Sequence, residues 1–278
     1  MSTRDSTIIT SLANPEVKSL YALRKRSERD ERGLFLIEGY RAITRAMDSD
    51  FKFDTLYFSP EWYLGDNEPA VIERAAQAGA RTVQLSKDAL AKATYRDRPE
   101  GLLAVGRQWH TGLADLHLPE SPFLIVVESI EKPGNLGTIL RSADATAADA
   151  VIVCDPVTDL FNPNVVRAST GVLFKVPVVI TTSADIITFL RDRHIQSVGA
   201  IVQASKNYTD DNFTLPTAIV MGSESFGLSA DWQTACDQPV RLPMLGVADS
   251  LNVSAATVVM AYEVLRQRAN LTHRERSQ

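Results

Sequence analysis

Three polar segments in the C-terminal half of the chain carry residue types that could bind a ligand or act on one. They combine glycine, asparagine, serine and charged residues, and they span 128–144, 221–229 and 242–256. In an open α/β sheet, ligands bind at the carboxyl ends of the strands. Segments of this composition after three separate strands predict one site at one edge of a sheet.

The first segment joins a turn to a helix. Pro133 and Gly134 allow a turn into a helix whose first backbone amides are unpaired. Asn135 and Arg141 are six residues apart, so they share a helix face only if the helix begins after Asn135. An arginine in that position could hold a phosphate or a ribose oxygen with its planar fork. The alternative is an asparagine cap and a surface arginine.

The other two segments add a glycine and further polar side chains. Gly222 follows an apolar strand and would let the backbone approach a flat ligand. Glu224 could accept hydrogen bonds from a hydroxyl, or it is an exposed loop carboxylate. Ser250 and Asn252 precede a long predicted helix, so Asn252 either serves a ligand or caps that helix. Ser254 has the same two alternatives.

Motifs for other common chemistries are absent from the sequence. It contains no Gly-x-Gly-x-x-Gly, no Walker loop, no nucleophile elbow and no histidine-rich metal spacing. Its two cysteines, Cys154 and Cys236, are far apart, which excludes a disulfide scaffold and a cysteine zinc site. We therefore predict no bound metal and assign no catalytic role to the four histidines.

The elements that must position these segments alternate as in an α/β fold. Apolar runs at 123–127, 150–154, 176–180, 197–202 and 218–221 predict strands, and 134–147, 185–193 and 252–268 predict helices. The run at 123–127 is continuous, as expected of a strand covered on both faces. A shorter alternation of predicted helices and strands fills 15–105. Residues 109–122 have no clear period and contain two prolines, so we predict a linker there. The predicted organisation is a small α/β domain at 1–108, a linker at 109–121 and an α/β domain with a parallel sheet at 122–278.

Composition and charge are those of a globular cytoplasmic protein. No stretch approaches the roughly 20 apolar residues of a membrane helix, and the N-terminus lacks the apolar core of a signal peptide. The net charge of −5 by itself argues weakly against nucleic acid. Basic residues nevertheless gather between Lys18 and Arg32. Such a local face could bind phosphate, or it is a solvated helix face of mixed charge.

Together, the three segments resemble the motifs of the SpoU branch of the SPOUT methyltransferases. Asn-Leu-Gly-Thr-Ile-Leu-Arg-Ser-Ala at 135–143 resembles motif 1, Met-Gly-Ser-Glu at 221–224 motif 2, and Ser-Leu-Asn-Val-Ser at 250–254 motif 3. The run 164–171 between them is also similar to the family pattern. Ser225 departs from it, because the family often has glycine there.

The N-terminal part has a resemblance of its own. Asn-Pro-Glu-Val-Lys at 14–18 and Gly-Leu-Phe-Leu-Ile-Glu-Gly-Tyr-Arg at 33–41 resemble the L30e-like RNA-binding domain that many of these enzymes carry. The resemblance therefore covers nearly the whole chain. It implies an α/β SPOUT domain with a parallel sheet and a deep trefoil knot, preceded by a small L30e-like α/β domain.

The resemblance also implies an activity, which is methyl transfer from S-adenosylmethionine to a ribose 2'-hydroxyl of RNA. It implies a homodimer through the C-terminal domain with the active site near the interface, and no metal. The appended L30e-like domain favours large-subunit rRNA as the substrate, with tRNA as the alternative. Two other functions are a non-catalytic RNA-binding module and a nucleotide-dependent oxidoreductase, and the missing glycine fingerprint argues against the second.

Site residues follow from the same motifs. The residues implied to act on the reacting ribose are Asn135, Arg141, Glu224, Ser250 and Asn252. Those implied to bind S-adenosylmethionine are Met221, Gly222, Leu242, Met244, Leu251 and Ser254. Those expected to bind RNA are Arg24, Arg26, Arg41 and Arg167. Arg141 would either help to remove the 2'-hydroxyl proton or orient the ribose and stabilise the developing alkoxide.

Overall fold

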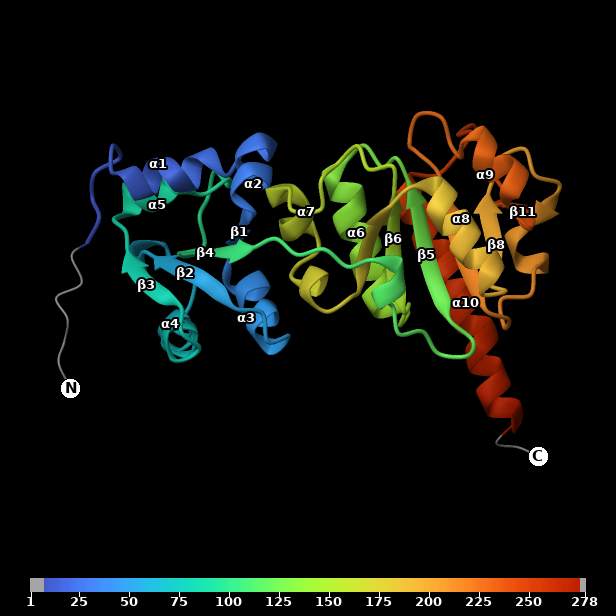
Figure 1. Cartoon of the computed structure of the whole chain (residues 1–278), viewed down its shortest axis with the longest axis horizontal. Coiled ribbons are helices and arrows are strands. Elements are labelled where there is room, and N and C mark those ends of the chain that lie inside the picture. The colour runs from blue at the N-terminus through green and yellow to red at the C-terminus, as the bar shows by residue number, and fades with distance from the viewer. Residues whose placement is uncertain (1–7, 276–278) are drawn as a thin grey trace. The chain divides into compact units, whose positions relative to one another are not determined.

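The computed structural model describes the backbone of residues 8–275 and the side chains of residues 8–270. These residues form two compact units (Figure 1). The first contains 8–109 and 159–175, and the second contains 110–158 and the chain from 176 onward. The sequence-based boundaries assigned 159–175 to the larger domain, because that segment lies between two of its predicted strands. In the structure it packs with the first unit instead.

The first unit is built on a four-stranded sheet with the order β1-β4-β2-β3. β4 is antiparallel to both β1 and β2, while β2 and β3 are parallel. Its strands are β1 (Leu34–Glu38), β2 (Phe53–Phe58), β3 (Arg81–Gln84) and β4 (Leu102–Arg107). Its helices are α1 (Pro15–Ala22), α2 (Arg26–Arg32), α3 (Tyr40–Asp48), α4 (Glu68–Gln77), α5 (Lys87–Ala93) and α7 (Pro163–Ala168). Ser86 caps α5, because its side chain accepts from the Ala89 N–H.

Aromatic packing explains why 159–175 belongs to this unit. Phe161 and Phe174 from that segment pack against Phe35 of β1, with ring centroids 4.8 and 6.2 Å apart. Trp109 also contacts Phe161, at 4.9 Å. Gly171 fits because a Cβ there would lie 2.8 Å from the Arg45 Cβ, and its φ of +90° favours glycine.

A buried ion pair ties the same segment to α2. The Arg29 side chain is 1 % exposed and donates to Asp159 Oδ2 at 2.7 Å and to the carbonyl oxygens of Leu23 and Arg24 at 2.9 Å. The sequence allowed two interpretations of the charged run around α2, a phosphate-binding face or a solvated helix face, and neither includes a buried side chain. The one buried side chain of α2 is this arginine.

The second unit contains a seven-stranded sheet in which every neighbouring pair is parallel, as predicted. The strand order is β7-β6-β5-β10-β8-β11-β9. The strands are β5 (Phe123–Glu128), β6 (Ala150–Cys154), β7 (Val178–Thr181), β8 (Gln196–Ala200), β9 (Lys206–Asn207), β10 (Thr217–Met221) and β11 (Gln238–Arg241). β9 and β11 were not predicted, because neither is an apolar run.

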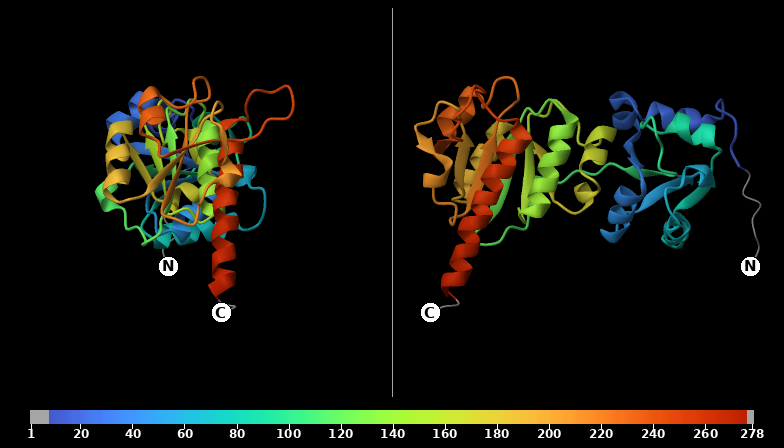
Figure 2. Two further views of the ribbon diagram at one scale, coloured as in Figure 1. Left: turned by 90° about the vertical axis from the view of Figure 1, so that its right-hand side faces the viewer. Right: turned by 180° about the vertical axis from the view of Figure 1, so that it is seen from behind.

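Helices cover both faces of this sheet (Figures 1 and 2). α8 (Ser183–Asp192) and α9 (Ala230–Ala235) pack together on one face, and α6 (Pro133–Ala145) and α10 (Val253–Glu275) on the other. Alternate residues of each strand face opposite layers, so the central strands are buried throughout. Within residues 8–275, no helix is both long and apolar enough to cross a membrane.

Candidate active site

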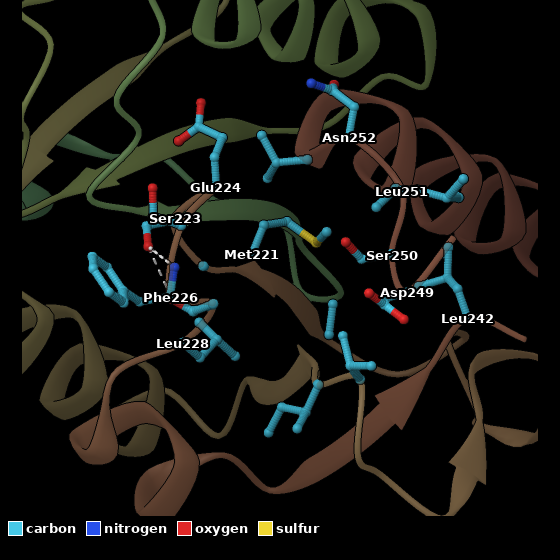
Figure 3. Close-up of a pocket in the computed structure, with 18 of the residues that line it drawn as sticks. Met221, Ser223, Glu224, Phe226, Leu228, Leu242, Asp249, Ser250, Leu251 and Asn252 are labelled. Atoms are coloured by element: carbon cyan, nitrogen blue, oxygen red, sulfur yellow. Dashed lines mark hydrogen bonds between the residues drawn. The ribbon is translucent and has the colours of Figure 1, made fainter. Parts of the chain in front are cut away.

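A pocket of about 500 Å³ lies where β8, β10 and β11 end. Because these strands are parallel, their carboxyl ends meet at one edge of the sheet, together with the start of α10. Two of the three predicted segments contribute most of the walls (Figure 3). The lining includes Lys132, Ala200, Ile201, Val202, Gln203, Met221, Gly222, Ser223, Glu224, Ser225, Phe226, Gly227, Leu228, Gln233, Leu242, Met244, Asp249, Ser250, Leu251, Asn252, Val253 and Ala256.

The loop after β10 folds back on itself at one side of this pocket. Ser223 and Gly227 exchange two backbone hydrogen bonds, with N···O distances of 3.0 and 3.1 Å. A Cβ at Gly222 would lie 2.0 Å from the Gly227 carbonyl carbon, so no other residue fits without moving the backbone. Gly222 lines the pocket as expected, but the close approach that requires glycine is made by the loop itself.

Glu224 connects this loop to the start of α6. Its Oε2 accepts from the Glu131 N–H at 2.9 Å, and its Oε1 accepts from the Asn135 Nδ2 at 2.6 Å and the Lys132 N–H at 3.2 Å. Burial acts to raise the pKa of this carboxyl, but the donated hydrogen bonds outweigh it and lower the pKa below its usual value. Glu224 is therefore ionised at neutral pH, with both oxygens occupied.

Asn252 joins the third segment to the first. Its Nδ2 donates to Asn135 Oδ1 at 3.2 Å, while its Oδ1 accepts from the Ser254 N–H at 3.0 Å and the Ser254 hydroxyl at 2.6 Å. Asn252 thus caps α10 with one amide atom and contacts motif 1 with the other. Ser254 serves the cap and is not among the residues that line the pocket. We call the bonded side chains Glu224–Asn135–Asn252 the motif bridge.

Arg141 does not join the motif bridge. α6 begins at Pro133, before Asn135, so the condition for the two side chains to share a face is not met. Six residues correspond to about 600° of helical rotation, which leaves them about 120° apart around the axis. Arg141 is exposed and makes no hydrogen bond or ion pair within the described part of the chain. It does not line the pocket either.

The pocket has an apolar floor and a polar rim. Met221 and Leu228 are 2 % and 4 % exposed, whereas Asp249 and Ser250 are exposed around the opening (Figure 3). The expected residues Leu242, Met244 and Leu251 line it as well. Sequence reasoning missed Asp249, although it directly precedes Ser250. It also missed the turn after β8, which carries no distinctive composition.

The four arginines expected to bind RNA all lie in the first unit, and two of them share a pocket. The Arg24 guanidinium lies over the rings of Tyr21 and Tyr95, at 4.9 and 5.0 Å from their centroids. Arg26 pairs with Asp30 at 3.3 Å. Arg41 and Arg167 are 126 residues apart in the sequence but line the same pocket, which is separate from the one described above. Among the described residues, no group of three or more His, Cys, Asp and Glu side chains could hold a metal ion.

Comparison with known families matches both parts of the chain. Residues 122–262 match the SpoU rRNA methylase family, and residues 14–104 match an MRM3-like substrate-binding domain. The chain is 32 % identical over 258 residues to the 23S rRNA (uridine(2479)-2'-O)-methyltransferase of Streptomyces viridochromogenes, covering 88 % of this chain and 87 % of that protein. It is 28 % identical over 261 residues to the 23S rRNA (guanosine(2553)-2'-O)-methyltransferase RlmP of Bacillus subtilis, covering 92 % and 98 %.

A solved structure agrees over a similar range. The AdoMet-bound rRNA methyltransferase from Sinorhizobium meliloti superposes with a TM-score of 0.85 at 31 % sequence identity. The match covers 93 % of this chain and 97 % of that one. The similarity therefore includes the fold of both parts.

Proposed function

Because the chain belongs to the SpoU rRNA methylase family, we propose that it methylates a ribose 2'-hydroxyl of large-subunit rRNA, with S-adenosylmethionine as the methyl donor. The motif bridge carries this proposal, since it ties all three motif segments to one pocket. Two relatives act, by their names, on a uridine and on a guanosine of 23S rRNA. The proposal therefore specifies the RNA but not the target base.

The pocket suits S-adenosylmethionine. Its volume of about 500 Å³ falls within the range of roughly 300–1,000 Å³ that is typical of small-molecule sites. Met221, Leu228 and Val253 offer buried apolar surface to an adenine ring, and the backbone at Gly222 forms a wall without a side chain. Asp249 and the Ser250 hydroxyl offer polar partners at the rim. When bound, the donor supplies an electrophilic methyl group on a sulfonium.

The residues of the motif bridge act by positioning. In-line transfer requires the ribose oxygen to be held against the methyl group in one orientation. Glu224 fixes the Asn135 amide from one side and Asn252 fixes it from the other, so the amide plane is determined before RNA binds. Glu224 is a poor proton acceptor because its pKa is lowered and both of its oxygens already accept hydrogen bonds. We assign Glu224 a positioning role and Ser250 a contact to the ribose.

Arg141 requires a second subunit in this proposal. We propose a homodimer through the C-terminal domain, in which Arg141 meets the site at the interface. An exposed apolar stripe supports this, since Tyr262 and Leu265 are 49 % and 37 % exposed and lie three residues apart, on one face of α10. The stripe runs along α10, which packs beside α6, the helix that carries Arg141. An arginine stays protonated, so its role would be to orient the ribose and stabilise the developing alkoxide.

Light scattering tests the dimer. At micromolar concentration the protein should have the mass of two chains, and Tyr262→Asp should shift it toward the monomer and reduce methylation. A monomeric wild-type protein that methylates RNA at full rate would contradict the proposal.

The N-terminal unit is proposed to bind the RNA. Its match to a substrate-binding domain supports this assignment, as do the half-buried Arg24 and the exposed Arg26 and Arg41. With Arg167, these side chains would contact phosphates and release counterions, so binding should weaken as salt rises. We also propose the deep trefoil knot of SPOUT domains in the second unit, and a cytoplasmic location, where rRNA is available. Pulling the unfolded chain from both ends should give a contour shorter than that of an unknotted chain of the same length.

Methyl transfer to defined RNAs tests the function. Purified protein with methyl-labelled donor should label unmodified 23S rRNA at one ribose, mapped by resistance of the adjacent phosphodiester to alkali. Transfer to tRNA alone would replace the substrate with the tRNA alternative. RNA binding without any transfer would support a non-catalytic module.

A further inference from the structure

A second pocket, of about 440 Å³, lies within the N-terminal unit and is not used by the proposed reaction. It is formed by the end of β1, the start of α3, the turn before α4, the residues before β4 and α7. Three carboxylates and three guanidinium groups line it: Glu38, Glu68, Glu100, Arg41, Arg96 and Arg167. The formal charge of the pocket is therefore zero, but the negative and positive side chains lie at different depths in it.

Two of the carboxylates are buried. Glu38 is 8 % exposed and accepts a hydrogen bond from the Tyr95 N–H, and burial raises its pKa. Glu68 is 3 % exposed, and its Oε1 accepts from the N–H groups of Leu64 and Gly65 at 2.9 and 3.2 Å. Its Oε2 has no hydrogen-bond partner. A buried acceptor without a donor costs free energy, so this end of the pocket is suited to a ligand that brings N–H groups.

Two of the three cations lie further out. Arg41 and Arg167 are exposed, so the guanidinium groups of both are hydrated and can contact a phosphate at the pocket opening. Arg96 is half-buried and pairs with Glu100, and its Nε is buried without a partner. The pocket therefore presents acceptors at depth and positive charge at the rim. A phosphate would be repelled from the interior and attracted to the opening.

The hydrogen-bonding groups of the four RNA bases indicate which base fits the buried carboxylates. Guanine presents two adjacent donors, N1–H and the N2 amino group, which match a carboxylate in a bidentate pair. Adenine and cytosine present an amino group beside an acceptor nitrogen, and uracil presents one imino group between two carbonyl oxygens, so each would direct an acceptor at the carboxylates. Proteins read unpaired RNA bases by such edge contacts.

We propose that this pocket binds an unpaired guanosine nucleotide of the RNA substrate, with the base edge at Glu38 and Glu68 and the phosphate at Arg41 and Arg167. This inference rests on the proposed function, because it takes the ligand to be part of the RNA. It adds a base preference to a unit that would otherwise contact only phosphates. Phosphate contacts set affinity, whereas base contacts set specificity.

Binding of the four ribonucleoside 5'-monophosphates to the full chain tests the inference. Calorimetry should find that GMP binds at least about tenfold more tightly than AMP, CMP or UMP, the discrimination expected of one bidentate pair. Glu38→Gln keeps an acceptor oxygen for the Tyr95 N–H but loses the carboxylate, so the preference for GMP should fall to less than about twofold. Arg41→Gln should weaken all four nucleotides by a similar factor. Glu73→Gln, an exposed carboxylate of α4 outside the pocket, should change nothing.

The same preparations separate this inference from the proposed function. Each variant is also titrated with S-adenosylmethionine, which binds in the other unit, and its melting temperature is measured. Equal binding of the four nucleotides by a wild-type protein that binds the donor normally would overturn the guanosine pocket alone. Failure to bind the donor, with the GMP preference intact, would instead count against the proposed function. Should Glu38→Gln unfold, Glu68→Gln provides the same test, because its amide oxygen can still accept from Leu64 and Gly65.

Discussion

The Asn252 side chain donates a hydrogen bond to Asn135 at 3.2 Å across a sequence separation of 117 residues. The same amide caps α10 through its oxygen. One side chain therefore couples the start of a 23-residue helix to the geometry of motif 1. Because Glu224 holds Asn135 from the other side, the order of the pocket depends on three side chains from three segments.

Asn252→Ser should separate the two roles of this residue. Serine is as good an N-cap as asparagine, so the melting temperature should stay within about 2 °C of the wild type. Serine lacks the amide donor, so methylation should fall by about 10²–10³ in single turnover, the usual effect of losing one positioned donor. Asn252→Ala should lose about 1 kcal/mol of stability as well. Near-normal rates in the serine variant would remove the motif bridge from the mechanism.

Arg141 should affect the reaction without affecting the fold. It is exposed and forms no ion pair in the described chain, so Arg141→Ala should leave the melting temperature and the donor affinity unchanged. The methylation rate should fall by about 10²–10³. Arg141→Lys keeps the charge but loses the planar fork, so a low rate indicates orientation and a rescued rate indicates charge alone. Arg191→Ala, an exposed arginine of α8, is the matched control.

Gly222→Ala should disrupt the donor pocket. The added Cβ would lie 2.0 Å from the Gly227 carbonyl carbon, so the loop after β10 must move. We expect calorimetry to find S-adenosylmethionine binding weakened by at least about tenfold, or about 1.4 kcal/mol. Gly246→Ala lies in the loop before Asp249, where an added Cβ meets nothing within 4 Å, and should bind the donor normally. Equal affinity in both variants would contradict the assigned pocket.

Glu224 should make stability depend on pH in the acid range. Its pKa is lowered in the folded state, so it contributes stability that is complete well above its ordinary value of 4.5 and is lost as pH falls below that value. Glu224→Gln should therefore lower the free energy of unfolding at pH 7. It should also make that free energy fall less steeply as the pH is lowered from 7 into the acid range. Urea denaturation at several pH values measures both. An unchanged acid slope would mean that the three hydrogen bonds to Glu224 are weak in solution.

Removing one partner of the buried Arg29–Asp159 pair should destabilise the first unit more than replacing both partners. Asp159→Ala leaves a buried guanidinium without its partner and should cost about 3–5 kcal/mol. The exposed pair of Arg74 with Asp48 offers a control, since Asp48→Ala should cost less than about 1 kcal/mol. Replacing Arg29 and Asp159 together by Met and Leu should recover much of the loss, as measured by urea denaturation. Equal effects of the two alanine variants would refute the buried role.

The sequence by itself determined the parallel sheet and the segments around its site. The run 150–154 was predicted as a strand and is one, because a strand buried on both faces must be apolar throughout. Glycine, asparagine and serine after β10 and β11 indicated a binding edge, and their spacing resembled known motifs. These properties depend on residues close in the chain, where periodicity and turn chemistry act directly.

Only the tertiary structure decided which distant residues meet. Nothing local to α7 indicates that its segment packs on the first unit, because that packing depends on the complementary aromatic surface of Phe35 and Trp109. Arg29 is buried because Asp159 and two carbonyl oxygens satisfy it, although a run of charged residues suggests a solvated helix. Arg41 and Arg167 likewise share a pocket that no spacing predicts. Local sequence sets periodicity, whereas burial of a charge or closure of a pocket depends on partners that only the folded chain brings together.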